Sequence, residues 1–391
     1  MPTHSVGRGG EALRTAGRLL RGVSTPGAGG RVLRDDARIL VLQIQQLGDT
    51  LAASGVVRAV SRRYPGASID VLASPVAAGV YARSSHVRRI HTVARSTHAL
   101  GRALAWARAI RVARRERYDC VLACTNHVSV RHGLLAWLTG APERVGFDRG
   151  GRGFFFTVRL PVRTERSCYE ENMDLARAVD CLFGASEGEP ADIAFDGSDE
   201  RQVAALLVAH HIPAGRPLVV LHPGANWQSK TWYAERWSTV ADALAVDGYH
   251  PVFVGVASEA PLVQSIRLAM QQTSASLLGC ITVPELAALL TQAALFVGTD
   301  SGPRHVAAAV GCLQVTIMSA QDVVTRWRIP GARETILRSE PPCAGCLQSS
   351  CSHRRCMNGI GADAVVRACR EARAGERAVW RPNVPVIQGV R

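Results

Sequence analysis

The sequence has almost no lysine. Of its 46 basic residues, 45 are arginine and one, Lys230, is lysine. An ammonium is a compact, mobile point charge that suits phosphate oxygens, whereas a guanidinium is a planar fork. The position of Lys230 therefore marks its loop as a candidate phosphate-binding site. The alternative is chance, since a single lysine must fall somewhere.

The chain also lacks long apolar runs. No stretch approaches the 18 apolar residues of a membrane-spanning helix, and residues 1–37 lack the apolar centre of a secretory signal. Its 11 cysteines, an odd number, argue against a complete disulfide framework. We therefore expect a cytoplasmic protein.

Acidic residues are fewer than basic ones. The excess of 46 basic over 32 acidic residues gives a net charge of +14, which suits an acidic partner such as a nucleotide, a phosphorylated glycolipid or an anionic membrane surface. The arginines along 102–117 either dock the protein peripherally on the inner face of the cytoplasmic membrane or form a solvated helix face. No zinc finger or RNP-type aromatic motif is present, so we expect no nucleic-acid partner.

At 391 residues the chain is too long for one ordinary core and fits two domains. The pattern in the first half predicts strands at 38–44, 69–73 and 119–123, with helices at about 51–64, 100–115, 167–183 and 199–211. Residues 148–166, which contain three phenylalanines in a row, are expected to form a loop at a ligand or partner, or a plain turn. In the second half, strands are predicted at 218–222, 251–254, 276–278, 295–297 and 315–318.

Alternating strands and helices predict parallel sheets with right-handed crossovers, and hence an α/β chain of two doubly wound halves. The expected organisation is a basic flexible extension (1–37), an N-terminal domain (38–185), a linker region (186–216), a C-terminal domain (217–342), and a cysteine-rich segment with the tail (343–391). Ligands bind such sheets at the carboxyl ends of the strands.

The first motif, Gly48-Asp49-Thr50, follows the first predicted strand. Asp49 either caps the following helix by accepting backbone N–H bonds or faces the ligand as a carboxylate able to take a proton from a hydroxyl.

The second motif is the lysine loop, His222-Pro-Gly-Ala-Asn-Trp-Gln-Ser-Lys-Thr-Trp232. Gly224 lets the backbone approach a ligand closely, Asn226 and Ser229 add neutral hydrogen-bonding groups, and Lys230 supplies the charge. We expect Trp227, Trp232 and Trp237 to pack the base of the loop, with stacking on a nucleobase as the alternative.

The third motif, Gly298-Thr-Asp-Ser-Gly-Pro-Arg-His305, joins a strand to a helix whose first position suits Pro303. The N–H groups of Ser301, Gly302 and their neighbours, with the helix dipole, make an anion site. Asp300 repels phosphate, so it contacts a sugar or ribose hydroxyl or orients the turn. His305 donates to a diphosphate or is a structural histidine.

In this order, the three motifs resemble the family 9 glycosyltransferases, the heptosyltransferases of lipopolysaccharide core assembly and their relatives, over about residues 38–370. The resemblance implies a GT-B fold, with two Rossmann-like domains facing across a cleft. It makes 38–185 the acceptor-binding domain and 217–342 the nucleotide-sugar-binding domain. It also implies inverting transfer of a sugar, such as the heptose of ADP-heptose, to a glycolipid or saccharide hydroxyl, with no cofactor required.

Position by position, the resemblance makes Asp49 the general base. The expected donor-binding residues are Gly224, Asn226, Lys230, Glu259, Asp300, Ser301, Gly302 and His305. Within them, Lys230 binds the phosphates, Glu259 contacts the nucleoside ribose and Asp300 contacts the transferred sugar.

Two departures leave part of the specificity open. The helix after Asp49 reads Thr50-Leu-Ala-Ala-Ser-Gly55, where the family has bulky aliphatics, and Ser319-Ala320-Gln321 replaces a Gly-Pro-Thr turn near the base of the nucleotide. The alternatives are therefore a GT-B transferase that uses another nucleotide sugar, for exopolysaccharide or a secondary metabolite, and a non-catalytic nucleotide-binding protein. A dinucleotide-binding oxidoreductase is disfavoured, because neither half shows Gly-x-Gly-x-x-Gly after its first strand.

Four cysteines cluster near the carboxyl end of the chain. Cys343, Cys346, Cys351 and Cys356, with His353 among them, are candidate ligands of a structural zinc or iron–sulfur centre. Their spacing matches no standard zinc finger, and free or redox-responsive thiols are the alternative. None of them is expected to take part in the transfer.

Overall fold

The structure, a computed structural model, describes residues 32–93, 98–124, 130–181, 191–375 and 381–382. The chain divides between Asp192 and Ile193 into two compact units, the N-terminal unit and the C-terminal unit. Most of the expected basic extension (1–31), the start of the expected linker region (186–190) and most of the tail after residue 375 lie outside the described residues. Among the described helices, none is long and apolar enough to cross a membrane.

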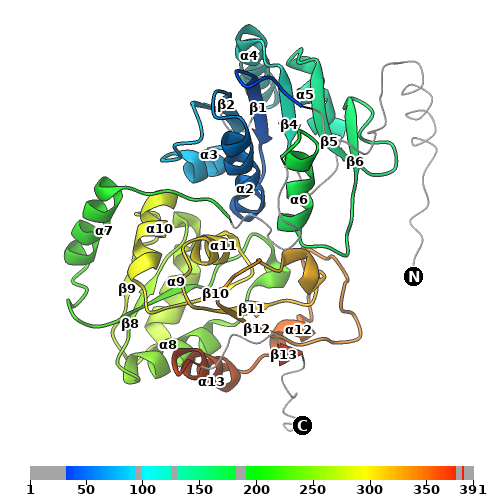
Figure 1. The fold of residues 1–391 in the computed structure, drawn as a ribbon. Helices are drawn as coiled ribbons and strands as arrows, with labels where there is room; N and C mark the ends of the chain where they lie inside the picture. Colours follow the sequence, from blue (N-terminus) through cyan, green and yellow to red (C-terminus); the bar gives the residue numbers. More distant parts are fainter. Residues whose placement is uncertain (1–31, 94–97, 125–129, 182–190, 376–380, 383–391) are drawn as a thin grey trace. The chain divides into compact units, whose positions relative to one another are not determined.

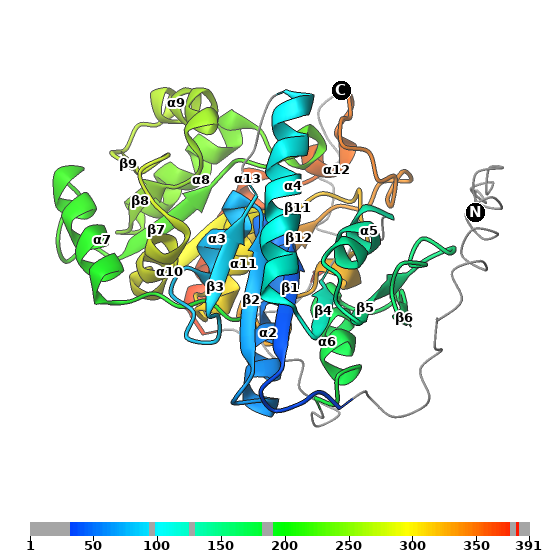
Figure 2. The ribbon, with the colours of Figure 1, turned by 90° about the horizontal axis from the view of Figure 1, so that it is seen from above.

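Within its described residues, the N-terminal unit contains six parallel strands in the order β3-β2-β1-β4-β5-β6, with helices on both faces (Figures 1 and 2). Residues 39–42 of its central strand are fully buried, as a strand covered on both faces requires. The strands are β1 (Arg38–Gln43), β2 (Ser68–Ala73), β3 (Arg89–Thr92), β4 (Cys120–Ala123), β5 (Glu143–Asp148) and β6 (Val158–Pro161). The helices are α2 (Leu47–Arg63), α3 (Pro75–Tyr81), α4 (Ala99–Glu116), α5 (Val130–Leu138) and α6 (Cys168–Arg177).

In the part of the C-terminal unit that the structure describes, seven parallel strands lie in the order β13-β12-β11-β10-β7-β8-β9. The strands are β7 (Leu218–His222), β8 (His250–Phe253), β9 (Ala275–Ser276), β10 (Leu295–Thr299), β11 (Gln314–Met318), β12 (Glu334–Arg338) and β13 (Arg381–Pro382). The α-helices are α7 (Gly197–Ala209), α8 (Ala234–Val246), α9 (Ala260–Ala269), α10 (Val283–Gln292), α11 (Gly302–Ala309), α12 (Arg355–Asn358) and α13 (Ala362–Arg373), and three short 3₁₀ helices are η1 (Gln228–Lys230), η2 (Ala257–Glu259) and η3 (Val324–Trp327).

The core of the C-terminal unit joins the sheet to α8 and α13. Val219 and Val297 from the central strands lie in one buried cluster with Trp237 of α8 and Val365 of α13. Trp232, at the end of the lysine loop, packs edge-on against Trp237 with ring centroids 5.4 Å apart. The base of the lysine loop is therefore fixed to the core.

The predicted alternation of strands and helices is confirmed in both units, and with it the doubly wound α/β fold. Two expectations were wrong in detail. Helix α2 begins at Leu47 rather than near Leu51, with Gln46 as its N-cap. The segment 148–166 is not a single loop, because it includes the last residue of β5 and the whole of β6, and Phe156 within it is only 2% exposed.

Candidate active site

Two of the three motifs lie side by side at one edge of the C-terminal sheet. β7 ends at His222, where the lysine loop begins, and β10 ends at Thr299, just before Asp300. The two strands pair in parallel, with Gly298 opposite His222. Because ligands bind at the carboxyl ends of parallel strands, this edge is the candidate donor site.

Lys230 pairs with Asp300 in a chain of alternating charges. The Lys230 Nζ lies 2.7 Å from Oδ2 of Asp300, and a guanidinium nitrogen of Arg304 lies 2.9 Å from Oδ1. Arg304 is fully buried and also donates two hydrogen bonds to Glu334, at 2.6 and 2.8 Å. Two cations and two carboxylates thus form a chain with no net charge.

The two cations keep Asp300 ionised. Burial alone raises the pKa of a carboxyl, but the charges of Lys230 and Arg304 outweigh it and hold the pKa of Asp300 well below its usual range. Each carboxylate oxygen of Asp300 accepts a hydrogen bond from a cationic side chain. Each also has a second lone pair, which can accept a hydrogen bond from a sugar hydroxyl. The expectation that Asp300 contacts the transferred sugar stays a prediction that this geometry permits.

Two tryptophans flank the Lys230 ammonium. Its Nζ lies 5.7 Å from the ring centroid of Trp227 and 5.8 Å from that of Trp327, within cation–π range. Trp232 and Trp237 are buried in the core, as expected. The same expectation was wrong for Trp227, which is 39% exposed and lies beside the charge instead of beneath the loop.

Helix α11 presents its amino end at the same edge. Ser301 is its N-cap residue, yet the Ser301 side chain makes no capping hydrogen bond in the part of the chain that the structure describes. The helix begins at Gly302, one residue before the predicted start, and Pro303 stands second. His305, one turn in, is 2% exposed, and burial followed by the charge of Arg304 lowers its pKa to about 3. Any hydrogen bond that His305 donates at neutral pH therefore comes from an uncharged imidazole.

Glu259 lies in a space that two glycines leave open. A Cβ added at Gly224 or at Gly255 would overlap the Glu259 carboxylate. One oxygen of that carboxylate accepts from Val256 N at 3.0 Å and lies 3.4 Å from Nε2 of His222. Burial raises the Glu259 pKa, but the contact with His222 and the Val256 N–H together leave it below the usual value. The structure therefore brings Glu259 and Gly224 together beside Lys230's loop.

Asp49 is the one predicted site residue in the N-terminal unit. It is the third residue of α2 and is 8% exposed. Gln46 is the N-cap of that helix, so the alternative in which Asp49 is the cap was wrong. A carboxylate in the first turn is stabilised by the helix dipole. Asn226 lies exposed in the lysine loop, where its amide is accessible to a ligand.

The cysteine segment (residues 343–356) contacts the lysine loop on one side and the turn near residue 320 on the other. Its backbone bonds to the lysine loop through Ser229 N to Ser349 O at 3.2 Å, and the Gln228 amide oxygen accepts from Cys351 N at 2.9 Å. On its other side, Gly345 N donates to Ala320 O at 2.7 Å. The segment therefore ties the lysine loop to the turn near residue 320.

The cysteines do not assemble as a metal site in this arrangement. Within the described residues, no group of three or more His, Cys, Asp or Glu side chains is placed to hold a metal ion. Cys351 and His353 approach each other, with sulfur and Nδ1 3.6 Å apart. A structural zinc or iron–sulfur centre at these cysteines therefore stays a prediction.

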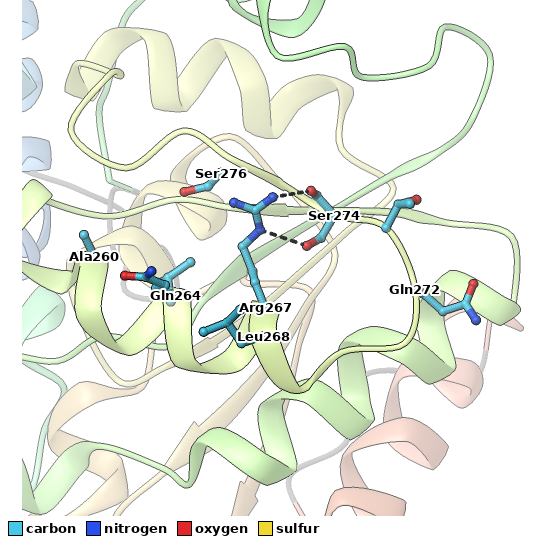
Figure 3. A pocket seen from close by; sticks show the side chains of 9 residues that line it. Ala260, Gln264, Arg267, Leu268, Gln272, Ser274 and Ser276 are labelled. Atoms are coloured by element: carbon cyan, nitrogen blue, oxygen red, sulfur yellow. Dashed lines mark hydrogen bonds between the residues drawn. The ribbon is translucent and has the colours of Figure 1, made fainter.

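A separate hollow of about 580 Å³ lies along α9 and the segment that leads to β9 (Figure 3). The charged side chain in its lining, Arg267, bonds to the side chain and backbone of Ser274 at 3.3 and 3.0 Å. None of the predicted site residues lines this hollow. It is therefore not part of the candidate site.

Sequence reasoning missed four residues that shape the donor edge: His222, Arg304, Trp327 and Glu334. His222 and Arg304 stand inside the quoted motifs. A fully buried arginine needs a carboxylate partner, but the sequence alone does not show that Arg304 is buried. Trp327 and Glu334 lie outside every motif. No sequence signal pointed to either.

Comparison with known proteins identifies the class. The sequence pattern of glycosyltransferase family 9 (heptosyltransferase) matches residues 106–356. The chain is 27% identical to lipopolysaccharide heptosyltransferase 3 of Escherichia coli over 292 residues, covering 72% of this chain and 83% of that protein. Its fold is similar to that of a family 9 glycosyltransferase from Veillonella parvula DSM 2008 (TM-score 0.74, 19% identity, 88% and 99% covered). It is also similar to that of the E. coli ADP-heptose lps heptosyltransferase II (TM-score 0.70, 20% identity, 87% and 99% covered).

The fold and the matched pattern define a glycosyltransferase of the GT-B class, built from two Rossmann-like sheets. More specifically, the chain belongs to glycosyltransferase family 9.

Proposed function

We propose that this enzyme transfers a heptose-like sugar from ADP-heptose to a hydroxyl of a glycolipid or saccharide, in the synthesis of a cell-surface polysaccharide. The observation that carries the proposal is the meeting of Lys230, Asp300 and the amino end of α11 at one edge of the C-terminal sheet. These groups suit a sugar attached to a diphosphate. The names of the relatives, which are lipopolysaccharide heptosyltransferases, support the choice of sugar and nucleotide.

In the proposed reaction, Asp49 accepts the proton of the acceptor hydroxyl as its oxygen attacks the anomeric carbon. The bond from that carbon to the diphosphate oxygen breaks, and ADP leaves with the electron pair. Attack from the side opposite the leaving group inverts the configuration. The charge that develops on the leaving phosphate is neutralised by Lys230 and by the positive end of the dipole of α11.

In the proposed reaction, Lys230 binds a phosphate oxygen of the donor. Its Nζ lies 2.7 Å from Oδ2 of Asp300, and its ammonium has three N–H donors that can serve more than one oxygen. Arg304 keeps its own bond to Asp300 at 2.9 Å. A buried carboxylate without a counter-charge is costly. Arg304 therefore keeps Asp300 paired when the Lys230 ammonium turns toward the phosphate.

A direct assay tests the proposal. The purified enzyme is given ADP-heptose and a heptose-deficient lipopolysaccharide acceptor, and ADP release is followed together with the mass and anomeric configuration of the product. Asp49→Asn is expected to lower kcat by roughly 10²–10⁴-fold, the usual contribution of a general base, and EDTA is expected to leave turnover unchanged. Near-normal turnover of Asp49→Asn would refute the role of the base.

A second candidate is transfer from another nucleotide sugar, for exopolysaccharide or a secondary metabolite. The observation that favours it is the turn at residues 319–321, whose backbone carbonyls at Ala320 and Gln321 accept hydrogen bonds from the cysteine segment. That turn departs from the family sequence near the expected base of the nucleotide. Turnover with UDP-, GDP- or dTDP-sugars and none with ADP-heptose would select this candidate.

We also propose that the enzyme works in the cytoplasm at the inner face of the membrane. Arg111, Arg114 and Arg115 are exposed on α4 and line a hollow of about 710 Å³, and clustered arginines attract anionic lipid. Sedimentation with vesicles of phosphatidylglycerol, but not of phosphatidylcholine, is expected. Loss of binding in the triple Arg→Gln variant would assign it to this helix, and equal binding to both vesicles would contradict the proposal.

A further inference from the structure

Trp327 borders the candidate donor site, although it lies outside every sequence motif. It is the last residue of η3 and is half-buried. Its ring centroid lies 5.8 Å from the Lys230 Nζ. It also lies 5.8 Å from the ring centroid of His305, with the two rings edge-on at 74°. Lys230 in turn contacts Asp300 at 2.7 Å. The indole therefore stands beside the residues that the proposed function assigns to the diphosphate and to the transferred sugar.

The orientation of this indole is fixed at its nitrogen. The Trp327 Nε1 donates to Oδ2 of Asp322 at 2.6 Å, and the other oxygen of that carboxylate accepts from Val323 N at 2.7 Å. The backbone of the same turn is held as well. One guanidinium nitrogen of the buried Arg338 donates to the carbonyl oxygens of Ser319 and Asp322, at 3.1 and 2.7 Å. A ring anchored in this way loses little conformational freedom when a ligand packs on it.

An aromatic face suits one side of a sugar ring. The π-electrons make the face of an indole negative, and the C–H bonds on the less polar side of a sugar are weakly positive, so the two surfaces attract each other. A diphosphate has no apolar surface of this kind. An indole can also stack on a nucleobase, but the contacts of Trp327 are with Lys230 and His305, the residues assigned to the diphosphate.

We infer that Trp327 is a specificity-determining residue, whose ring packs against the apolar face of the donor's sugar. The inference rests on the proposed function, because it assumes that a nucleotide sugar binds with its diphosphate at Lys230 and its sugar at Asp300. The sugar hydroxyls then bond to the Asp300 carboxylate while the C–H face lies on the indole. Trp327 therefore favours a nucleotide that carries the sugar over the nucleotide alone.

Two substitutions at this position separate the aromatic face from the side chain's bulk. Trp327→Leu removes the aromatic face but keeps an apolar side chain, and Trp327→Phe keeps a smaller ring without the N–H that bonds to Asp322. The dissociation constants of ADP and of ADP-heptose are measured by titration calorimetry in the absence of acceptor. Thermal unfolding checks that each variant is folded.

The preference for ADP-heptose over ADP is the quantity that decides. Trp327→Leu should weaken the binding of ADP-heptose by about three- to tenfold, the usual contribution of an aromatic contact, and leave the binding of ADP almost unchanged. Trp327→Phe should retain most of the preference. A merely structural role of Trp327 would weaken both ligands equally. So would a role confined to the Lys230 ammonium, because both ligands contain the diphosphate.

Trp227→Leu is the matched control. The Trp227 ring lies 5.7 Å from the same Lys230 Nζ, but it belongs to the lysine loop, which is bonded to the cysteine segment. Its removal takes away a cation–π contact of about the same length. We expect it to change the affinities for ADP and ADP-heptose to the same extent, because the ammonium serves the diphosphate that both ligands share.

The outcomes are distinguishable. If the unmodified enzyme does not bind ADP-heptose, the proposed function fails and this inference falls with it. If it binds ADP-heptose, but Trp327→Leu weakens both ligands equally or shifts the preference no more than Trp227→Leu does, only the role of Trp327 is overturned. Should Trp327→Leu fail to fold, the same comparison is made with Trp327→Met, which also removes the aromatic face.

Discussion

The buried pair between Arg304 and Glu334 offers the sharpest test of how the donor edge is held together. The Arg304 side chain is fully buried, and its guanidinium makes three hydrogen bonds of 2.6–2.9 Å to Glu334 and Asp300. Arg304→Met removes the cation and leaves Glu334 buried without it. Removing one partner of a buried ion pair lowers the free energy of unfolding by about 3–5 kcal/mol.

The loss is measured as a shift in melting temperature. For a unit of about 200 residues, each kcal/mol corresponds to roughly 2–4 °C, so Arg304→Met should lower the melting temperature by about 6–20 °C. The matched control is Arg370→Met. Arg370 binds Asp247 with the same two-pronged geometry, at 2.8 and 2.9 Å, but its side chain is 58% exposed. Water screens this surface pair, so little change is expected.

A double variant tests the cause. Arg304→Met combined with Glu334→Gln removes the uncompensated charge, and it should recover part of the stability lost in Arg304→Met alone. If Arg304→Met melts within the range of the Arg370→Met control, the argument from burial is refuted. If the double variant is less stable than Arg304→Met, the loss comes from packing or hydrogen bonds and not from the buried, uncompensated charge of Glu334.

Three further predictions concern the same edge. Lys230→Arg keeps the positive charge but should raise the donor KM by about tenfold in steady-state assays. The rigid, planar guanidinium suits a bidentate partner, whereas the ammonium can rotate to meet a phosphate oxygen. An unchanged KM would contradict this. Gly224→Ala should weaken ADP binding and cost about 1–3 kcal/mol in chemical denaturation, since its Cβ displaces the Glu259 carboxylate, whereas Gly361→Ala, whose Cβ meets open space, is the control. The buried imidazole of His305 has a pKa of about 3 against roughly 6.5 when unfolded, so as pH falls between these values only the unfolded chain takes the proton, and stability should fall by up to about 1.4 kcal/mol per pH unit. The slope should be shallower in His305→Gln, and equal slopes would show that His305 does not titrate in this way.

Much of the fold follows from local patterns. Runs such as Ile39-Leu-Val-Leu42 are apolar throughout because both faces of a central parallel strand are covered, and these strands were predicted. The strands that escaped prediction lie toward the sheet edges. β3, with Arg89 and His91, alternates polar and apolar residues and is only partly buried. β12 ends in a buried Arg338 that the sequence does not distinguish from a surface arginine.

The position of the two motifs in the fold was predictable, because each follows an apolar run that the sequence marks as a strand. The structure brings the lone lysine and the Asp-Ser-Gly-Pro turn together at the carboxyl ends of β7 and β10. The partners were not predictable, because Glu334 lies 30 residues beyond Arg304 and reaches it only through the pairing of β11 with β12. The Ser301 hydroxyl lies 2.9 Å from Nδ1 of His222, which ends another strand. Tertiary contacts of this kind leave no periodicity in the sequence.

The use of one lysine among 45 arginines follows from the roles at this edge. Arg304 has a fixed role: its fork holds Glu334 with two parallel bonds and Asp300 with a third, and none of these has to move. Lys230 has a different role, since the proposed reaction needs its charge to reach a donor phosphate from its place beside Asp300. A compact ammonium on a flexible stem can turn between two oxygen acceptors, whereas a guanidinium bound bidentately has to break two aligned bonds at once. Arginine therefore suits position 304, where the hydrogen bonds stay fixed, and lysine suits position 230, where the charge has to reach a ligand.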